Sequence, residues 1–276
     1  MESFEIALRR VRERAPLVQC ITNFVTVNDC ANIILAAGGS PSMAQDEREA
    51  EEAVTCAQAL VCNMGAVERL PSMLLAGKRA NVLGIPVVLD PVACGGTQLR
   101  QDASRKLLDH VRFSVIRGNA SEIRFLAGQQ TAGSGVDVTA SDAITEENLA
   151  DGVAAATTLA QKTGSVVAVS GALDIISDGT RTAILRNGCA TMARITGSGC
   201  MVTSLIGAFC GANPGDAFTA AAAAMGSMGV CGELAEAKRL KYGTGNASFR
   251  TDLIDAMFNL TPEQLTEGIH YELYQR

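Results

Sequence analysis

The sequence is poor in aromatic and charged residues. Its 276 residues include no tryptophan, 4% aromatic residues and 19% charged residues, against a hydrophobic fraction of 47%. This balance excludes an intrinsically disordered chain and predicts a large buried core. No low-complexity linker or internal repeat divides the chain. We therefore expect a single domain over residues 1–276, a length that suits one large α/β domain.

Positive charge is also scarce. The formal net charge of −6 argues against nonspecific binding to nucleic acid or to an anionic membrane surface. The N-terminus lacks the apolar core of a signal peptide. No apolar run is both long and uninterrupted enough to span a bilayer, and the small-residue stretch 220–228 is short. We expect a cytoplasmic protein with no nucleic-acid and no membrane partner.

Disulfide, zinc and histidine chemistry all lack their usual residues. The nine cysteines are an odd number without any C-x-x-C pair, as expected for a reduced intracellular protein. The two histidines, His110 and His270, lie far from any cysteine at ligand spacing, which argues against structural zinc. Neither histidine falls in a loop near a predicted strand end. This placement argues against Ser-His-Asp and Cys-His catalysis.

The common nucleotide-binding loops are missing as well. The stretch Gly77-Lys78-Arg79 has neither the spacing nor the hydroxyl of a Walker A loop. No G-x-G-x-x-G follows a predicted strand, which weakens a dinucleotide-binding interpretation. A nucleotide site, if the chain has one, is therefore built differently.

Short apolar runs alternate with helical patterns along the chain. Strands are expected at 17–21, 59–63, 85–90, 113–117 and 165–171, followed by a hairpin over 175–185 with an Asp-Gly turn. Helices are expected at 3–14, 29–37, 104–110 and 144–162, with residues 40–43 as a loop and 128–141 as a long polar loop. This order predicts an α/β fold with a mostly parallel central sheet covered by helices on both faces.

Unusual polar residues follow the predicted strands. Ligands gather at the carboxyl ends of the strands in such sheets, so this pattern favours an enzyme. The residues that share this placement are Thr22, Asn23, Asn63, Asp90, Arg117, Gly118, Asn119, Glu122 and Ser170.

A glycine-rich turn, Ile195-Thr196-Gly197-Ser198-Gly199-Cys200, opens the apolar run 201–209. Glycines let the backbone bend tightly, and the free N–H groups at a helix start favour an anion. Such a cradle, with carboxylates and an arginine nearby, supplies the parts of Mg²⁺-assisted phosphoryl transfer.

Five segments, taken in order, resemble the hydroxyethylthiazole kinase family of the ribokinase-like superfamily. They are 16–25, 40–43, 89–92, 117–122 and 196–200, and the similarity extends from about residue 16 to residues 243–249. The resemblance implies a ribokinase-like fold and ATP-dependent phosphorylation of 4-methyl-5-(2-hydroxyethyl)thiazole in thiamine metabolism. It also implies a homotrimer with active sites at the subunit interfaces.

The resemblance further implies a role for each site residue. Asn23, Met43, Gly65 and Gly197 would bind the thiazole; Arg117, Ser170 and Asn119 would bind ATP; Asp90 and Glu122 would hold Mg²⁺; and Gly197, Ser198 and Gly199 would form the anion hole. The residues themselves leave structural alternatives open: a turn-capping Asn23, a core Met43, and an Arg117 that pairs with Glu122.

Cys200 stands where many ribokinase-like kinases carry the aspartate that acts as base, which matches the thiazole kinase subgroup. A thiol at a helix start can have its pKa lowered to about 3.5–7.5, so Cys200 is a candidate base. It can equally orient the alcohol, or be a small buried apolar residue. Two other functions also stay open: a hydroxymethylpyrimidine-type or other small-alcohol kinase of the same fold, and a non-catalytic nucleotide-binding regulator.

Overall fold

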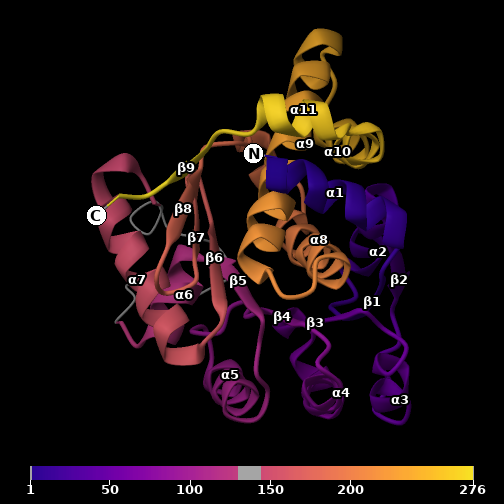
Figure 1. The fold of residues 1–276 in the computed structure, drawn as a ribbon, viewed down its shortest axis with the longest axis vertical. Helices are drawn as coiled ribbons and strands as arrows, with labels where there is room; N and C mark the ends of the chain where they lie inside the picture. The colour runs from indigo at the N-terminus through magenta and orange to yellow at the C-terminus, as the bar shows by residue number, and fades with distance from the viewer. Residues whose placement is uncertain (1, 130–143, 276) are drawn as a thin grey trace.

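The computed structural model describes residues 2–129 and 144–275, in which nine strands form one sheet (Figure 1). The spatial order of the strands is β2-β1-β3-β4-β5-β6-β7-β8-β9, parallel from β2 to β6 and antiparallel from β6 to β9. The strands are β1 (Leu17–Ile21), β2 (Ser40–Ser42), β3 (Ala59–Asn63), β4 (Val87–Asp90), β5 (Val115–Asn119), β6 (Val166–Ser170), β7 (Asp174–Ser177), β8 (Thr182–Leu185) and β9 (Tyr271–Leu273).

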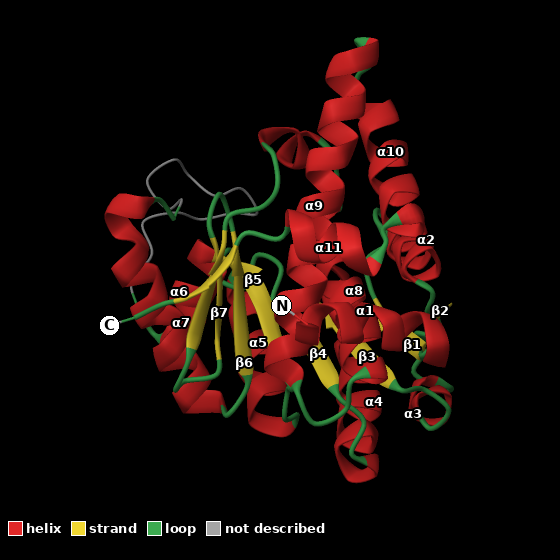
Figure 2. Ribbon diagram, turned by 45° about the horizontal axis from the view of Figure 1, so that its top comes forward, coloured by secondary structure: helices red, strands yellow, loops and turns green. Residues whose placement is uncertain are grey.

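Helices cover both faces of this sheet, as predicted (Figures 1 and 2). One face carries α1 (Glu2–Arg14), α2 (Val27–Ala37), α8 (Ser198–Ala212), α9 (Ala217–Tyr242), α10 (Asn246–Asn259) and α11 (Pro262–Gly268). The other face carries α3 (Ala50–Val54), α4 (Leu70–Leu83), α5 (Gln98–His110), α6 (Ala120–Ala127) and α7 (Leu149–Thr163). Three short 3₁₀ segments connect these elements: η1 (Met64–Arg69), η2 (Glu146–Asn148) and η3 (Ala190–Arg194).

Successive residues of a strand enter different cores, because side chains alternate across a sheet. In β3, Val61 joins the cluster under α8 and α9, whereas Leu60 and Cys62 join the cluster under α4. The parallel strands β3, β4 and β6 lie inside the sheet and therefore consist of continuous apolar residues up to their polar last residues.

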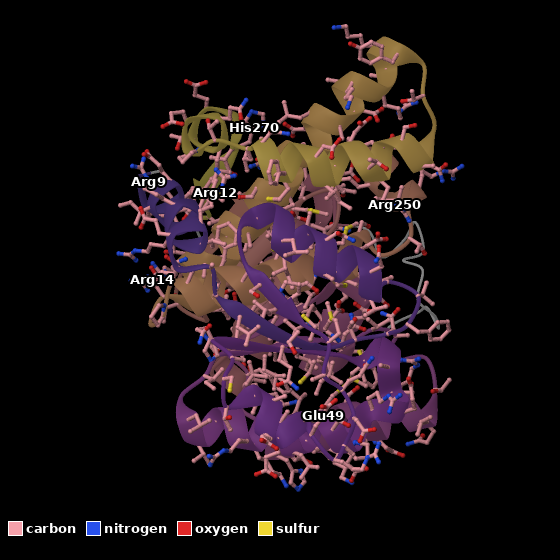
Figure 3. The ribbon with its side chains drawn as sticks, turned by 90° about the vertical axis from the view of Figure 1, so that its right-hand side faces the viewer. Arg9, Arg12, Arg14, Glu49, Arg250 and His270 are labelled. Atoms are coloured by element: carbon pink, nitrogen blue, oxygen red, sulfur yellow. The ribbon has the colours of Figure 1, made fainter. Side chains whose placement is uncertain are left out.

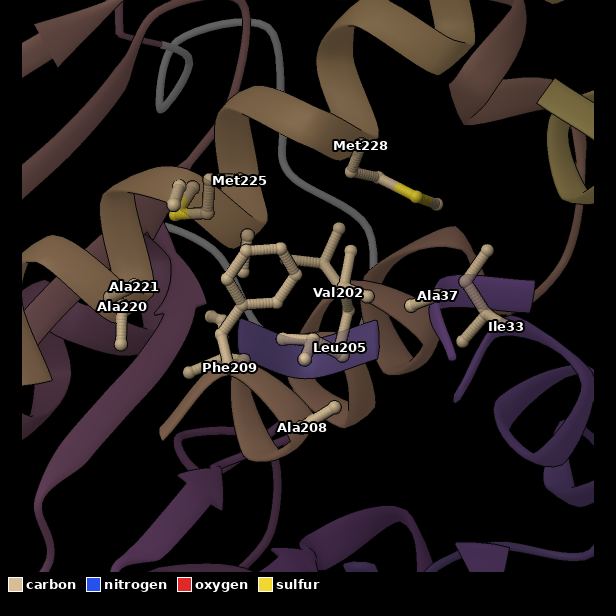
Figure 4. Packing of buried hydrophobic residues seen from close by; sticks show 14 of the residues in the cluster. Ile33, Ala37, Val202, Leu205, Ala208, Phe209, Ala220, Ala221, Met225 and Met228 are labelled. Carbon is tan, nitrogen blue, oxygen red and sulfur yellow. The ribbon is translucent and has the colours of Figure 1, made fainter. Parts of the chain in front are cut away.

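The two longest helices of the first face form its core. Figure 4 shows Val202, Leu205 and Phe209 of α8 packed near Met225 of α9 and Ile33 of α2. Within the described residues, α9 is the one helix long and apolar enough to cross a membrane, so the expectation that its apolar stretch is short was wrong. Its most apolar 18-residue window is 78% buried inside the structure, which identifies α9 as a core helix.

Charged residues lie on the outside of both helical layers. Figure 3 shows Arg9 and Arg14 on α1 and Arg250 on α10, while Glu49 lies on the opposite half of the molecule beside α3. All four residues are exposed. This distribution agrees with the low charge content of the sequence, because few charged residues are needed outside so large a core.

Two of the strands were not expected from the sequence. Residues 40–42, expected as part of a loop, form the edge strand β2, whose Pro41 pairs with Val18. An edge strand tolerates proline because only one of its sides needs ladder hydrogen bonds. The sequence also did not suggest β9, which pairs with β8 next to the hairpin at 174–185 that was predicted correctly. Most of the polar loop expected at 128–141 lies outside the described residues.

Candidate active site

The site begins where the strand order reverses. From β1 the chain passes to β2 on one side and then to β3 on the other side, so the crevice beyond β1 and β3 is a topological switch point. Asn23 follows β1, and Asn63 is the last residue of β3. Asn23 Nδ2 donates a hydrogen bond to Asn63 Oδ1 at 3.3 Å across this crevice.

Asn63 is the centre of the polar contacts. Its Nδ2 donates to Asp90 Oδ2 at 3.0 Å and to Cys200 Sγ at 3.2 Å. Its Oδ1 accepts from the Gly65 N–H at 2.8 Å. Asn23 Nδ2 reaches the same Cys200 sulfur at 3.5 Å. A fully buried amide thus joins the ends of β1, β3 and β4 to the first turn of α8.

Asp90, at the end of β4, is buried against three partners. Its Oδ2 accepts from Asn63 and from the Thr203 hydroxyl at 2.8 Å, and it lies 3.8 Å from Arg117 Nη1. Burial raises the pKa of Asp90, while the charge of Arg117 and the Thr203 hydrogen bond oppose this increase. Arg117 therefore forms its ion pair with Asp90 and not with Glu122, which the sequence had left open as an alternative.

Arg117 lies directly under the glycine-rich turn. Its Nη2 donates to the Ser170 hydroxyl at the end of β6. A Cβ on Gly199 would come within 2.6 Å of Arg117 Nη1, so the guanidinium packs where only glycine leaves space. Gly197 has a φ of +83°, and a Cβ there would meet Thr26 Cγ2 at 2.6 Å. Both glycines are thus required by local geometry.

The turn leaves free backbone donors at the start of α8. The first intrahelical bond is donated by the Met201 N–H to the Gly197 carbonyl at 2.8 Å. The N–H groups of Ser198, Gly199 and Cys200 precede it, and such groups have no partner within a helix. They lie at the positive end of a 15-residue helix, which favours an anion.

Glu122 occupies the first turn of α6 and forms a capping box with Asn119. Its Oε2 accepts from the Asn119 N–H and its Oε1 from the Ala93 N–H, both at 2.8 Å. Burial and the neighbouring charge of Asp90 raise the pKa of Glu122 to about 7. Two buried carboxylates, one of which raises the pKa of the other, form a donor set suited to a divalent cation.

The position of Cys200 at a helix start does not lower its pKa. Burial, and after it the charge of Asp90, raise the pKa of the Cys200 thiol. Three neighbours lower the pKa of Cys200 without cancelling this increase: Thr26 and Asn63 through hydrogen bonds, and Arg117 through its charge. The side chain is half-buried and is therefore neither an exposed thiolate nor an apolar core residue.

A cavity of about 1530 Å³ opens beside these residues. Asp90, Arg117, Asn119, Glu122, Ser170 and all of Gly197–Cys200 line it. Its far wall comes from η3 and from the α9 methionines Met225 and Met228. We refer to Asn23, Asn63, Asp90, Arg117, Ser170 and Cys200, which are linked by the contacts above, as the strand-end cluster.

The structure brings most of the expected site residues together, with one exception. Gly65 contacts Asn63 and would clash with Asn23 if it carried a Cβ. Asn23 also caps its own turn, because its Oδ1 accepts from the N–H groups of Val25 and Thr26, each at 3.1 Å. Met43 is half-buried against the core under α8 and does not line the cavity of this chain.

Two site residues had no role in the sequence-based interpretation. Thr203 looked like part of an apolar helix, although its spacing from Gly199 and Cys200 places it on the same helical face. Asp174, at the start of β7, was hidden in the hairpin, yet it lines the cavity and accepts from the Gly171 N–H at 2.9 Å. Burial raises the pKa of Asp174 to about 7.

Similar structures identify the class of protein. A pyridoxal kinase from Bacillus subtilis, solved as an ADP complex, superposes with a TM-score of 0.57 over 78% of this chain and 90% of its own. At 15% identity this likeness shows the fold alone. The strand order and this likeness place the chain in the α/β class with a ribokinase-like fold.

Closer relatives identify the family. The model of the hydroxyethylthiazole kinase family matches residues 8–263. A hydroxyethylthiazole kinase from Clostridium beijerinckii is 48% identical over 256 residues, 92% of this chain and 91% of that protein. A hydroxyethylthiazole kinase structure from Pyrococcus horikoshii has a TM-score of 0.87 at 34% identity, with both chains fully covered. The chain belongs to the hydroxyethylthiazole kinase family and is an enzyme.

Proposed function

We propose that the protein transfers the terminal phosphoryl group of ATP to the hydroxyl of 4-methyl-5-(2-hydroxyethyl)thiazole, giving the thiazole phosphate used in thiamine biosynthesis. The strand-end cluster is the observation that carries this proposal. It places a half-buried thiol, a buried carboxylate and a buried arginine around the start of one helix. Membership of the hydroxyethylthiazole kinase family supports the choice of acceptor.

The acceptor lies at the switch-point end of the cluster in this proposal. Asn23 contacts the Cys200 thiol there, Gly65 packs against Asn23, and Gly197 opens the turn that carries Cys200. Met43 would cover the thiazole ring with a polarizable side chain. Two exposed residues beside Asn23 support a pocket that is completed by another subunit. Phe24 is 85% and Val25 57% exposed in the isolated chain.

The phosphates lie at the other end, against Arg117, Ser170 and Asn119 and the free N–H groups of the glycine-rich turn. Arg117 supports this role, since its buried Nε has no hydrogen-bond acceptor in the described part of the chain. A cationic donor left unpaired in this way suits a phosphate oxygen. The turn from Gly197 to Gly199 then acts as an anion hole for charge that develops during transfer.

Asp90 and Glu122 would hold Mg²⁺, directly or through water. The described residues contain no group of three or more His, Cys, Asp or Glu that could hold a metal ion. Two carboxylates therefore fit an ion that keeps several waters and shares phosphate oxygens. When bound, Mg²⁺ supplies charge neutralisation for the phosphates. The chain's own residues orient the two substrates.

Cys200 is the residue against which we place the acceptor hydroxyl. Its raised pKa keeps it a thiol at neutral pH, which favours orientation of the alcohol over proton removal. Phosphoryl transfer through a loose transition state needs little proton removal, so an orienting thiol is sufficient. The role of Cys200 as a general base is the alternative that the substitutions in the Discussion address.

We also propose a single-domain, cytoplasmic enzyme that acts as a homotrimer. Nine free cysteines support a reducing compartment. The interfacial site is tested by subunit mixing, because Asn23 contacts Cys200 within one chain whereas Met43 lies apart from the cluster. If Met43 serves the neighbouring site, mixed Met43→Ala and Cys200→Ala subunits regain activity that neither variant shows alone. Molar mass in solution tests the trimer separately.

One assay tests the function. ADP release and phosphorylated product are measured with the thiazole alcohol, with a hydroxymethylpyrimidine alcohol and without acceptor, each with and without Mg²⁺. Mg²⁺-dependent formation of thiazole phosphate supports the proposal. Preference for the pyrimidine alcohol would assign a different acceptor, and nucleotide binding without turnover on any acceptor would refute the kinase activity.

A further inference from the structure

The loop after β4 contains a strained residue. Ala93 has a φ of +55°, and Ala15 is the other non-glycine residue with positive φ in the described ranges. L-amino acids disfavour this left-handed region, and such residues persist where surrounding contacts hold them, often at functional sites. Ala93 is buried, and its N–H donates to Glu122 Oε1 at 2.8 Å. The turn is therefore fixed from the α6 side.

An arginine fixes the same turn from the α5 side. Arg100, in the first turn of α5, donates through Nη1 to the Val92 carbonyl at 3.1 Å. The same Nη1 donates to the Met64 carbonyl at the start of η1. Gln101 of the same helix donates through Nε2 to the Gly95 carbonyl at 3.1 Å. The helix thus holds the loop after β4 at two points and the loop after β3 at one.

The bridge begins where the sheet ladder ends. The last paired residues of β3 and β4 are Asn63 and Asp90. Met64 directly follows Asn63, and Val92 lies two residues beyond Asp90. Arg100 therefore continues the connection between the two strands past their carboxyl ends. This matters because the side chains of Asn63 and Asp90, at those carboxyl ends, form a hydrogen bond of 3.0 Å that depends on the spacing of the two backbones.

We propose that Arg100 is a positioning residue for phosphoryl transfer. By bridging the Met64 and Val92 carbonyls, it fixes the backbone from which Asn63 and Asp90 face Cys200 and Arg117. The guanidinium suits this task because it is always charged and presents its donors in a rigid fork, whereas a lysine ammonium is a flexible point charge. The hydrogen bonds of the Arg100 side chain go to the Met64 and Val92 carbonyls and not to the six residues of the strand-end cluster. The expected effect on turnover rests on the proposed kinase function, whereas the structural role of the Arg100 bridge is independent of that function.

The bridge is tested by hydrogen exchange in Arg100→Ala, with Arg105→Ala as the matched control. Arg105 lies on the same helix, but its side chain is 61% exposed and pairs with the exposed Asp102. We expect faster amide exchange in peptides 62–68 and 90–97 of Arg100→Ala and unchanged exchange in the control. Unchanged exchange of both peptides in Arg100→Ala would overturn the bridge, whatever substrate the enzyme uses.

Positioning is tested by steady-state kinetics with whichever acceptor alcohol supports turnover in the wild type. We expect kcat to fall about 10- to 100-fold in Arg100→Ala, as misplaced catalytic groups generally cause, with smaller changes in both KM values. Added guanidinium ion at millimolar concentration should restore part of kcat in this variant and not affect Arg105→Ala. Arg100→Lys, which keeps the charge and packing, should retain an intermediate kcat. A wild-type kcat in Arg100→Ala, or an equal loss in Arg105→Ala, would overturn the positioning role.

Discussion

Replacing Asp90 by asparagine should lower the pKa of the Cys200 thiol. Asp90 Oδ2 and Cys200 Sγ both accept from Asn63 Nδ2, at 3.0 and 3.2 Å, so they lie within about 6 Å of each other. Two charges at this distance interact by about 3 kcal/mol at an effective dielectric constant of about 20, equivalent to about two pKa units. Cys200 is only half-buried, so solvent weakens the interaction, and we expect the pKa of Cys200 to decrease by less than this limit.

The rate of alkylation of Cys200 as a function of pH measures this change, because the thiolate is the reactive form. Cys56 is exposed and Cys189 is half-buried like Cys200, so both are first replaced by serine, and Cys200 is followed by mass spectrometry of its own peptide. Asp102→Asn is the control, since Asp102 is a carboxylate on the exposed side of α5. Asp90→Asn should shift the midpoint to lower pH, and Asp102→Asn should leave it unchanged.

A midpoint that is unchanged or higher in Asp90→Asn would refute the reasoning. It would mean that burial alone sets the pKa of Cys200, and that the Asp90 carboxylate is neutral or screened where the thiol titrates. The same variant should also lose most kinase turnover, because the charge partner of Arg117 disappears. Loss of turnover without the pKa decrease would separate the catalytic role of Asp90 from its effect on the thiol.

Burial raises the pKa of the Asp174 carboxyl from 3.8 to about 7 in the folded protein. Ionisation of Asp174 therefore destabilises the native state; this cost grows as the pH rises from about 4 to about 7 and is complete above about pH 7. Asp174→Asn should therefore raise the melting temperature above about pH 7, with no gain below about pH 4. Gly199→Ala should push Arg117 aside and lower kcat/KM for ATP about 10- to 100-fold, but have little further effect in an Arg117→Ala background. Cys200→Ser should keep substrate binding and lower kcat. If Cys200 acts as a weak base that limits the reaction, Cys200→Asp should be at least as active as the wild type. Activity of Cys200→Asp well below that of Cys200→Ser would exclude the base role.

The strand ends could be predicted because apolar runs break off at polar residues there. Asn63 and Asp90 were placed correctly as the last residues of β3 and β4 from this pattern alone. The partners of Asp90 could not be predicted in the same way. Thr203 reaches it from 113 residues further along the chain, and helical periodicity does not reveal which strand a helix packs against. The same holds for the Arg100 bridge, because Arg100 precedes the helix expected at 104–110 and no local pattern links it to Met64 or Val92.

The short edge strand β2 and the thiol pKa were missed for different physical reasons. The sequence Ser40-Pro41-Ser42 has low strand propensity, and pairing with β1 overrides this preference. For Cys200, the position at a helix start suggested a lowered pKa, whereas burial beside Asp90 raises it. Both outcomes depend on neighbours that are distant in sequence. Local pattern therefore indicated which strand ends carry the polar cluster but could not determine its electrostatics.

The electrostatics of the cavity explain why a thiol can stand where related kinases carry an aspartate. Asp90, Glu122 and Asp174 all line the cavity, and the charge of Arg117 lowers the pKa of each against the opposing effect of burial. A fourth carboxylate at position 200 would lie about 6 Å or less from Asp90 and add repulsion where an anionic nucleotide must bind. A neutral thiol avoids this cost and still accepts hydrogen bonds from Asn23 and Asn63. In the proposed reaction, the site then relies on positioning and on the cationic and N–H donors around the phosphates, with proton removal as a minor contribution.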